Sequence, residues 1–263
     1  MQLKKGSKGE YVKQLQYLLD ITIDGDFGTK TEKAVKEYQK ENNLVVDGIV
    51  GSQTWEEINK ISNKYTLQQI YDTIQEKGYK WFDAGDYDVN IVGIRNSSTK
   101  GRVTNHYDDF ITISYKVGQD WVFRCWNATT DPGLYWIDNP SNSNGTAILV
   151  PGQYTSVYKI DFHNGKYEAL CQRNGEVSVF RDGNKDDIYN YATNSVDTGY
   201  FGINIHRSSA YKTGAYINKY SAGCQVFQDP DDFDEFMEIS YKAKDIWGNS
   251  FTYTLIDSKD IKK

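Results

Sequence analysis

A histidine and a cysteine that lie 18 residues apart offer the residue types needed for nucleophilic chemistry. His206 ends the stretch YFGINIH, and Cys224 follows three small residues in the stretch YSAGC. A neighbouring imidazole can take the proton of a thiol and hold the thiolate as an ion pair. Small residues before the cysteine would let a carbonyl group approach the backbone, whose successive N–H groups could stabilise an oxyanion. The alternative is that Cys224 is only a buried small apolar residue.

The residues before His206 alternate in a way that predicts a strand. Successive side chains of a strand point to opposite faces, so Phe201, Ile203 and Ile205 would share one face, which we expect to be the core face. The other face would carry Tyr200, Gly202, Asn204 and His206. His206 would then project from the polar face at the end of the strand, a position that suits a catalytic histidine better than a structural one.

The other histidines and cysteines favour structural roles. His106 and His163 lie in polar loop or hairpin contexts, which predicts surface or turn roles. Cys125 and Cys171 lie in strand-like runs, which predicts packing. The three cysteines are odd in number and widely spaced without a CxxC pair, so we expect neither a disulfide framework nor a zinc site. No metal and no cofactor are expected.

Composition excludes several classes of partner. The 263 residues carry a net charge of -6 with acids and bases interspersed, which argues against a nucleic-acid partner because such binding needs a basic face. No apolar run is long enough to span a membrane, so no membrane partner is expected. The charged N-terminal stretch lacks the apolar segment of a signal peptide, so we expect synthesis in the (host) cytoplasm without a signal peptide. We expect a monomer.

The first sixty residues contain an internal repeat. DGDFGTKT, at residues 24–31, recurs as DGIVGSQT at residues 47–54. Asp-Gly favours a tight turn, and the second glycine permits a positive φ. Apolar residues at helical spacing precede the first copy and follow both copies, which predicts three short helices. The predicted helical positions are Val12, Leu15, Leu18, Leu19, Ala34, Val35, Tyr38, Trp55, Ile58 and Ile61.

This N-terminal segment resembles the three-helix peptidoglycan-binding domain with repeated DG-x-[FV]-G turns. The resemblance covers residues 1–60, and we expect a peptidoglycan-binding domain at residues 1–62. It implies that the protein binds the bacterial cell wall, so the expected partner is peptidoglycan. On a structural interpretation, the aspartates and glycines of the repeat mainly build turns.

The rest of the chain predicts a mostly-β second domain at residues 66–263. Thr66 and Gln69 fit a capping box, and Gly78 fits the end of the helix that follows. Strand-like runs follow from about residue 88, including DFITISYKV, WVFRCW and EVSVFRD. One clear helix begins after Asp229 with Pro230 in its first position, and FTYTLID closes the chain as a strand. The expected fold class is α+β, a small three-helix domain followed by a mostly-β catalytic domain.

The segment around Cys224 resembles the catalytic signature of the L,D-transpeptidase family, H-G-x…S-x-G-C-x-R. The sparser resemblance covers about residues 88–257. It implies that Cys224 is the nucleophile, that His206 is the base, and that the N–H groups of Gly223 and Cys224 form an oxyanion hole. It also implies that Ser221 shapes the turn and that a backbone carbonyl near Arg207 or Ser208 orients His206.

Four residues are expected to bind or position the substrate: Ser221, Arg207, Asn204 and Tyr220. The sequence also departs from the family pattern. Arg207 replaces the glycine after the histidine, Ala222 stands before the motif glycine, and Val226 replaces the arginine two positions after the cysteine. The missing arginine leaves substrate positioning open, and Arg207 is a candidate to replace it.

Together the two resemblances imply an endolysin-like enzyme that acts on the bacterial cell wall. It would cleave a stem-peptide amide bond through a thioester on Cys224. If an amine rather than water resolves the thioester, the enzyme is a transpeptidase that cross-links the wall. A third possibility is a non-catalytic cell-wall-binding or virion structural protein.

Overall fold

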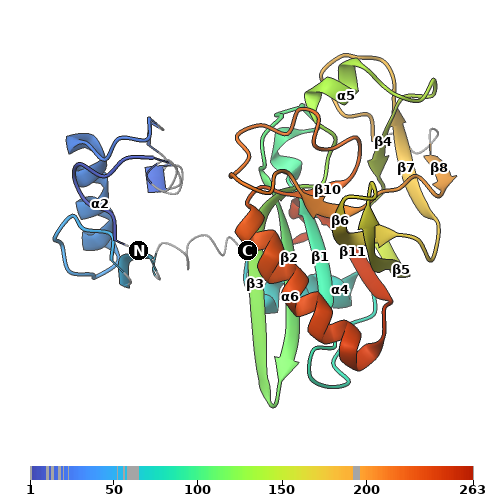
Figure 1. Cartoon of the computed structure of the whole chain (residues 1–263), viewed down its shortest axis with the longest axis horizontal. Coiled ribbons are helices and arrows are strands. Elements are labelled where there is room, and N and C mark those ends of the chain that lie inside the picture. The colour runs from blue at the N-terminus through green and yellow to red at the C-terminus, as the bar shows by residue number, and fades with distance from the viewer. Residues whose placement is uncertain are drawn as a thin grey trace. The chain divides into compact units, whose positions relative to one another are not determined.

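The chain folds into two compact units, Met1–Lys64 and Tyr65–Lys263 (Figure 1). The computed structural model describes residues 2–9, 12, 15–16, 19, 21–22, 24–51, 53–55, 57, 65–191 and 196–262. The mixed composition of helices and strands, with the strands in the second unit, confirms the predicted α+β class.

The repeat in the first unit is built around two buried glutamines. Gln16 Nε2 donates to Asp24 Oδ1 at 2.7 Å and to Thr31 Oγ1 at 3.0 Å, while its Oε1 accepts from the Gly25 amide at 2.8 Å. The repeat residues therefore satisfy a buried amide, because each buried polar group needs a partner.

The second copy repeats this arrangement 23 residues later. Gln39 Nε2 donates to Asp47 Oδ1 at 2.9 Å and to Thr54 Oγ1 at 3.2 Å, and its Oε1 accepts from the Gly48 amide at 2.9 Å. Gly25 and Gly48 both have a φ of +74°. These contacts support the structural interpretation of the repeat, in which the aspartates and glycines build turns.

Helix α2 (Thr29–Glu41) links the two copies. Its buried Val35 packs with residues from both ends of the unit, namely Leu3, Val12, Leu15, Phe27 and Val50. The predicted helical positions Leu18, Ile58 and Ile61 lie outside the described residues.

The second unit is an eight-stranded closed barrel in the order β1-β11-β5-β6-β9-β10-β3-β2. Its strands are β1 (Asn90–Arg95), β2 (Asp109–Val117), β3 (Asp120–Thr129), β5 (Gly152–His163), β6 (Tyr167–Gln172), β9 (Ile205–Arg207), β10 (Gln225–Phe227) and β11 (Phe251–Asp257). Two neighbouring pairs, β1·β11 and β9·β10, are parallel, and the other ladders are antiparallel. A separate sheet has the order β4-β7-β8 and comprises β4 (Thr146–Leu149), β7 (Val177–Asp182) and β8 (Val196–Gly199).

Two long helices pack against the barrel, and α5 (Leu134–Asp138) is a short third helix in this unit. Helix α4 (Leu67–Glu76) has the predicted capping box between Thr66 and Gln69, and Gly78 follows its end with a φ of +69°. Helix α6 (Pro230–Trp247), drawn in orange in Figure 1, begins at the predicted cap Asp229.

Helix α6 closes the main hydrophobic core with aromatic side chains. Phe236 lies 5.0 Å from Phe227 of β10 and 6.1 Å from Trp126 of β3, measured between ring centroids. Phe233 lies 6.2 Å from Tyr167 of β6. Burial of each such ring contributes about 1.5–3 kcal/mol. The core therefore anchors the strands β6 and β10, which flank β9.

The predicted strand through YFGINIH is wrong except at its end, because only residues 205–207 are extended in a ladder. Gly202 has a left-handed φ of +71°. The side-chain oxygen of Gln172 accepts the main-chain N–H groups of Phe201, Gly202 and Ile203 at 3.1, 2.9 and 3.1 Å. These donors are therefore satisfied by a side chain rather than by a strand.

Candidate active site

The parallel register of β9 and β10 brings His206 and Cys224 to neighbouring backbone segments. His206 pairs with Val226, and the Gln225 amide donates to Asn204 O at 2.9 Å. Cys224 directly precedes β10. Val226 therefore shares the face of His206, and Cys224 packs against the apolar cluster that contains Val226. Ile203 and Ile205, as predicted, point instead into the main core.

The His206 ring is held so that one nitrogen is left for chemistry. Its Nδ1 lies 2.8 Å from the carbonyl oxygen of Arg207. A carbonyl only accepts, so this contact assigns the proton to Nδ1 and leaves the lone pair on Nε2. This is the backbone contact expected from the sequence. The Tyr167 hydroxyl donates to the same carbonyl at 3.3 Å and lies 3.4 Å from Nδ1.

The thiol of Cys224 is bound by main-chain groups. Sγ donates to Gly202 O and accepts from the Asn204 amide, each at 3.4 Å. Among the described residues, no hydrogen bond joins Sγ to His206. The side chain of Cys224 is half-buried, and that of His206 is buried.

The electrostatics of the pair favour its neutral form. Burial raises the pKa of Cys224 to about 11, and the Asn204 amide opposes this shift. Burial, followed by the neighbouring ring of His163, lowers the pKa of His206 to about 3. Both shifts disfavour charge, so the resting pair is a thiol and a neutral imidazole rather than the ion pair that the residue types suggested.

The turn before Cys224 is fixed by tight backbone contacts. Gly223 has a φ of +121°, and a Cβ placed on it would lie 2.4 Å from Ala147 O. The Gly223 amide donates to Ser221 Oγ at 3.2 Å, and that hydroxyl donates to Cys224 O at 2.7 Å. The Cys224 amide has no acceptor within the described part of the chain. Of the two predicted oxyanion donors, the Gly223 amide is therefore engaged and the Cys224 amide is available.

Three of the four expected substrate-binding residues have other contacts. Ser221 is completely buried, so it shapes the turn rather than contacting a ligand. Asn204 is 5% exposed, and both ends of its amide are bonded within the protein. The Arg207 guanidinium lies 4.4 Å from the Tyr167 ring centroid and 3.4 Å from a carboxylate oxygen of Asp234, so it points toward α6. Burial of Ser221 and Asn204 therefore argues against direct substrate contact by these two side chains, whereas substrate contact by the part-exposed Arg207 stays a prediction.

Tyr220, the fourth predicted binding residue, is 41% exposed and precedes Ser221 in the turn. Its ring is accessible to a ligand. Val226, which stands where the family pattern has an arginine, is fully buried in a small apolar cluster with Tyr107 and Ile217.

His163 is the residue that sequence reasoning missed. It is 9% exposed, and its ring stacks on His206 with 4.1 Å between centroids and 23° between planes. The expected surface role is therefore wrong, whereas the hairpin context is confirmed, because the Lys166 amide donates to His163 O at 3.0 Å in the turn after β5. The two histidines are 43 residues apart in sequence, and only the barrel order β5-β6-β9 brings them together.

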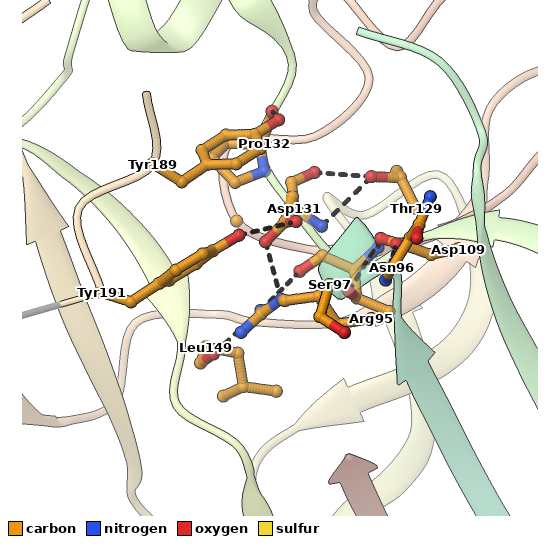
Figure 2. Close-up of polar contacts among 12 residues, drawn as sticks. Arg95, Asn96, Ser97, Asp109, Thr129, Asp131, Pro132, Leu149, Tyr189 and Tyr191 are labelled. Carbon is orange, nitrogen blue, oxygen red and sulfur yellow. Dashed lines mark hydrogen bonds and ion pairs between the residues drawn. The ribbon is translucent and has the colours of Figure 1, made fainter. Parts of the chain in front are cut away.

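A buried ionic network is centred on Arg95 and Asp131 (Figure 2). Arg95 Nε lies 2.9 Å from Asp131 Oδ1, and both side chains are almost completely buried. Arg95 Nη2 donates to Thr130 O at 3.1 Å and to Leu149 O at 2.9 Å. The Tyr191 hydroxyl donates to Asp131 Oδ2 at 3.2 Å. The network therefore fixes the backbone at residues 130–131.

Two contacts connect this network to the cysteine turn. The Gly133 amide donates to Ser221 O at 2.9 Å. The side-chain amide of Gln225 donates to Gly223 O at 3.2 Å and to Thr130 O at 3.4 Å. The position of Cys224 thus depends on the same backbone segment that Arg95 holds.

Within the described ranges, no group of three or more His, Cys, Asp or Glu residues is arranged to hold a metal ion. Across those same ranges, no helix combines the length and apolar character needed to cross a membrane.

Residues 10–58 match PG_binding_1, the peptidoglycan binding domain family. The zinc D-Ala-D-Ala carboxypeptidase of Streptomyces albus G is 36% identical over 69 residues, which are 23% of this chain and 27% of that protein. The chain thus spans about a quarter of the length of this curated relative.

Two solved structures are also similar. The endolysin of Burkholderia phage AP3 is 24% identical over 30% of this chain and 34% of its own, with a TM-score of 0.23. A fused Zn-dependent amidase/peptidase/peptidoglycan-binding protein from Clostridium acetobutylicum ATCC 824 is 17% identical over 97% of this chain and 99% of its own, also with a TM-score of 0.23. The family match to residues 10–58 shows that the N-terminal unit of the chain carries a peptidoglycan-binding domain.

Proposed function

We propose that the protein is an endolysin-like peptidoglycan hydrolase in which Cys224 attacks a stem-peptide amide and His206 is the base. The observation that carries this proposal is the β9·β10 register, which pairs His206 with Val226, two residues after Cys224, while Arg207 O holds the proton of Nδ1. Nε2 of His206 is then the nitrogen that can receive the thiol proton. The proposed domains are 1–62 for wall binding and 66–263 for catalysis.

The proposed reaction proceeds through a thioester. The thiol turns from Gly202 O toward His206, its proton moves to Nε2, and Sγ bonds to the carbonyl carbon. The Cys224 amide donates to the oxyanion. Nε2 then returns the proton to the departing amine as the C–N bond breaks. Water next gives a proton to Nε2 and attacks the thioester, which releases the acid and restores the thiol.

The neutral resting pair is compatible with this sequence of steps. Proton transfer accompanies the attack rather than preceding it, which is general base catalysis. Burial that suppresses charge in the resting site also protects the thiol from unproductive reactions. The wall-binding unit would raise the local concentration of substrate for this site by tethering.

A non-catalytic wall-binding protein is the second candidate. The observation that favours it is that Sγ donates to Gly202 O and makes no hydrogen bond to His206 among the described residues. On this alternative, Cys224 is a packing residue beside Val226.

Purified protein incubated with defined muropeptides, with products identified by mass, tests the proposal. The wild-type protein should shorten stems, whereas Cys224→Ala and His206→Gln should do so at least about 100-fold more slowly, because general base catalysis contributes about 10²–10⁴-fold. Cys125→Ala is the matched control and should retain the activity. All four proteins should still sediment with insoluble wall.

Each product pattern has its own interpretation. Cross-linked products without shortened stems would indicate that the enzyme is a transpeptidase rather than a hydrolase at the same cysteine. Equal product yields from wild type and Cys224→Ala would refute a role for this thiol. Wall binding without any product from wild type would favour the non-catalytic alternative.

A further inference from the structure

We propose that His163 is a positioning residue for His206, clamped by Asn204 so that the His206 ring keeps Nδ1 on Arg207 O and Nε2 available. This inference rests on the proposed function for its catalytic meaning. The clamp, which consists of the hydrogen bond between Asn204 and His163 and the stacking of His163 on His206, is a feature of the fold and can be measured without any substrate.

The clamp begins at an amide whose orientation is fixed. Asn204 Oδ1 accepts from the main-chain amide of Gln172 in β6 at 2.9 Å. The oxygen end is thereby assigned, so the other end, Nδ2, is the group that lies 2.9 Å from His163 Nδ1. An NH₂ group only donates, and therefore His163 Nδ1 must carry a lone pair. The neutral ring of His163 then bears its proton on Nε2.

The second nitrogen of His163 has a partner in the hairpin turn. Nε2 lies 3.0 Å from the side-chain amide of Asn164. The oxygen and nitrogen of that amide can exchange places by a half-turn, so an acceptor is available for the Nε2 proton. Both nitrogens of His163 are thus used in binding the protein, which leaves the ring itself as the surface that acts on its neighbour.

The ring of His163 restrains His206 by stacking. The centroid distance of 4.1 Å and the interplanar angle of 23° leave no room for the His206 ring to rotate toward β5. Tyr167 lies on the same side, 5.6 Å from the His163 ring, with its hydroxyl 3.4 Å from Nδ1 of His206. Asn204 directly precedes β9 (Ile205–Arg207), so the clamp lies only two residues before the base along the chain.

Protonation of His163 would undo the clamp. A proton on Nδ1 would face the donors of Asn204 and add a positive charge 4.1 Å from the base. Burial lowers the pKa of His163, and the charges of Arg173 and Lys166 lower it further. Arg173 is itself paired with Asp161, and the other groups facing the ring are Tyr167, Asn164 and His206. The neutral clamp is therefore the stable state near neutral pH.

Asn204→Asp is the most discriminating variant. A carboxylate can still accept from the Gln172 amide, but its second oxygen would accept a proton from His163 Nδ1, which reverses the tautomer and stabilises the charged ring. Asn164→Asp is the matched control, because it adds the same charge at Nε2 and leaves the Asn204 bond intact. His163→Phe keeps a stacking ring that cannot titrate.

The first measurement is NMR of the imidazole nitrogens in the full-length Cys224→Ala protein. His163 Nδ1 should be unprotonated in this background and in Asn164→Asp, and protonated in Asn204→Asp. The pKa of His206 should fall when His163 becomes charged. A protonated His163 Nδ1 in the Cys224→Ala background, or a His206 titration identical in all variants, would overturn the clamp.

The second measurement is the pH profile of muropeptide cleavage. Asn204→Asp should move the acid limb of kcat/KM to higher pH by about one unit and lower kcat about tenfold to 100-fold, with little change in KM, because only the base is displaced. In His163→Phe, the fall of kcat/KM at low pH that protonation of His163 causes should disappear. A uniform loss at every pH in both variants would show a merely structural role. If the wild-type protein cleaves nothing, the proposed function fails, and the NMR titrations alone decide on the clamp.

Discussion

Replacing Arg95 by methionine would leave the carboxylate of Asp131 buried without its cation. The two side chains are only 3% and 10% exposed, and 2.9 Å separates their charged atoms. Removing one partner of such a pair costs about 3–5 kcal/mol. The carbonyl groups of Thr130 and Leu149 would each lose a donor as well. We therefore expect Arg95→Met to destabilise the second unit by about 4–5 kcal/mol at pH 7.

Thermal unfolding of the full chain, followed by near-ultraviolet circular dichroism, measures this effect. For a unit of this size, 1 kcal/mol corresponds to about 2–4 °C, so the midpoint should fall by about 8–20 °C. The double variant Arg95→Met/Asp131→Leu removes both charges and should recover most of the loss. If the double variant is as unstable as the single one, lost packing rather than an unpaired charge explains the effect, and the reasoning is refuted.

The pH dependence supplies a second check. Burial already raises the pKa of Asp131, and Arg95 opposes that shift. Without Arg95, the folded-state pKa rises further above its unfolded value of about 3.9. The folded state then binds more protons than the unfolded state, so the deficit of Arg95→Met relative to wild type grows as pH rises from about 4 to neutrality. A deficit that stays constant between pH 5 and pH 7 would contradict this account.

Three further predictions follow from the turns and the thiol. Gly223→Ala should lower the free energy of unfolding by about 3 kcal/mol or more, because backbone strain adds to the clash with Ala147 O. Gly202→Ala, whose Cβ would meet nothing within 4 Å, should cost only about 1–2 kcal/mol. Equal losses for the two variants in urea unfolding would refute the close approach at Gly223. Gln39→Leu should lower the unfolding temperature of the wall-binding unit and weaken sedimentation with wall, because Asp47 loses its buried partner Gln39. An unchanged unfolding temperature of that unit would contradict this prediction. Alkylation of Cys224 by iodoacetamide should accelerate about tenfold per pH unit from pH 7 toward its pKa of about 11, and a plateau already at pH 8 would instead indicate a preformed thiolate.

Local signals in the sequence predicted local structure well. The capping box at Thr66, the Asp229 cap and the strand at residues 251–257 depend on neighbouring residues, and each is present in the structure. The strand predicted through residues 200–206 failed because a distant side chain, Gln172, takes its amides.

The candidate site was predictable only in part. The resemblance to the L,D-transpeptidase family implied that a backbone carbonyl near Arg207 or Ser208 holds His206, and the carbonyl of Arg207 does so. The stacking of His163 on His206 depends on the order of strands in a closed barrel, which no sequence spacing encodes. Burial of Asn204 and Ser221 likewise follows from tertiary packing and reverses the binding roles expected for them.

The parallel ladder between β9 and β10 is joined by a connection that is much more exposed than the ladder itself. Its register sets the spacing of His206 and Cys224, while the connection between the two strands reaches the surface, where Tyr211 is 95% exposed. Lengthening or exchanging residues 209–212 would therefore alter an exposed bend while the ladder pairing of His206 with Val226 stays as it is. Such a layout lets the exposed bend vary in length and sequence while the backbone around His206 is kept.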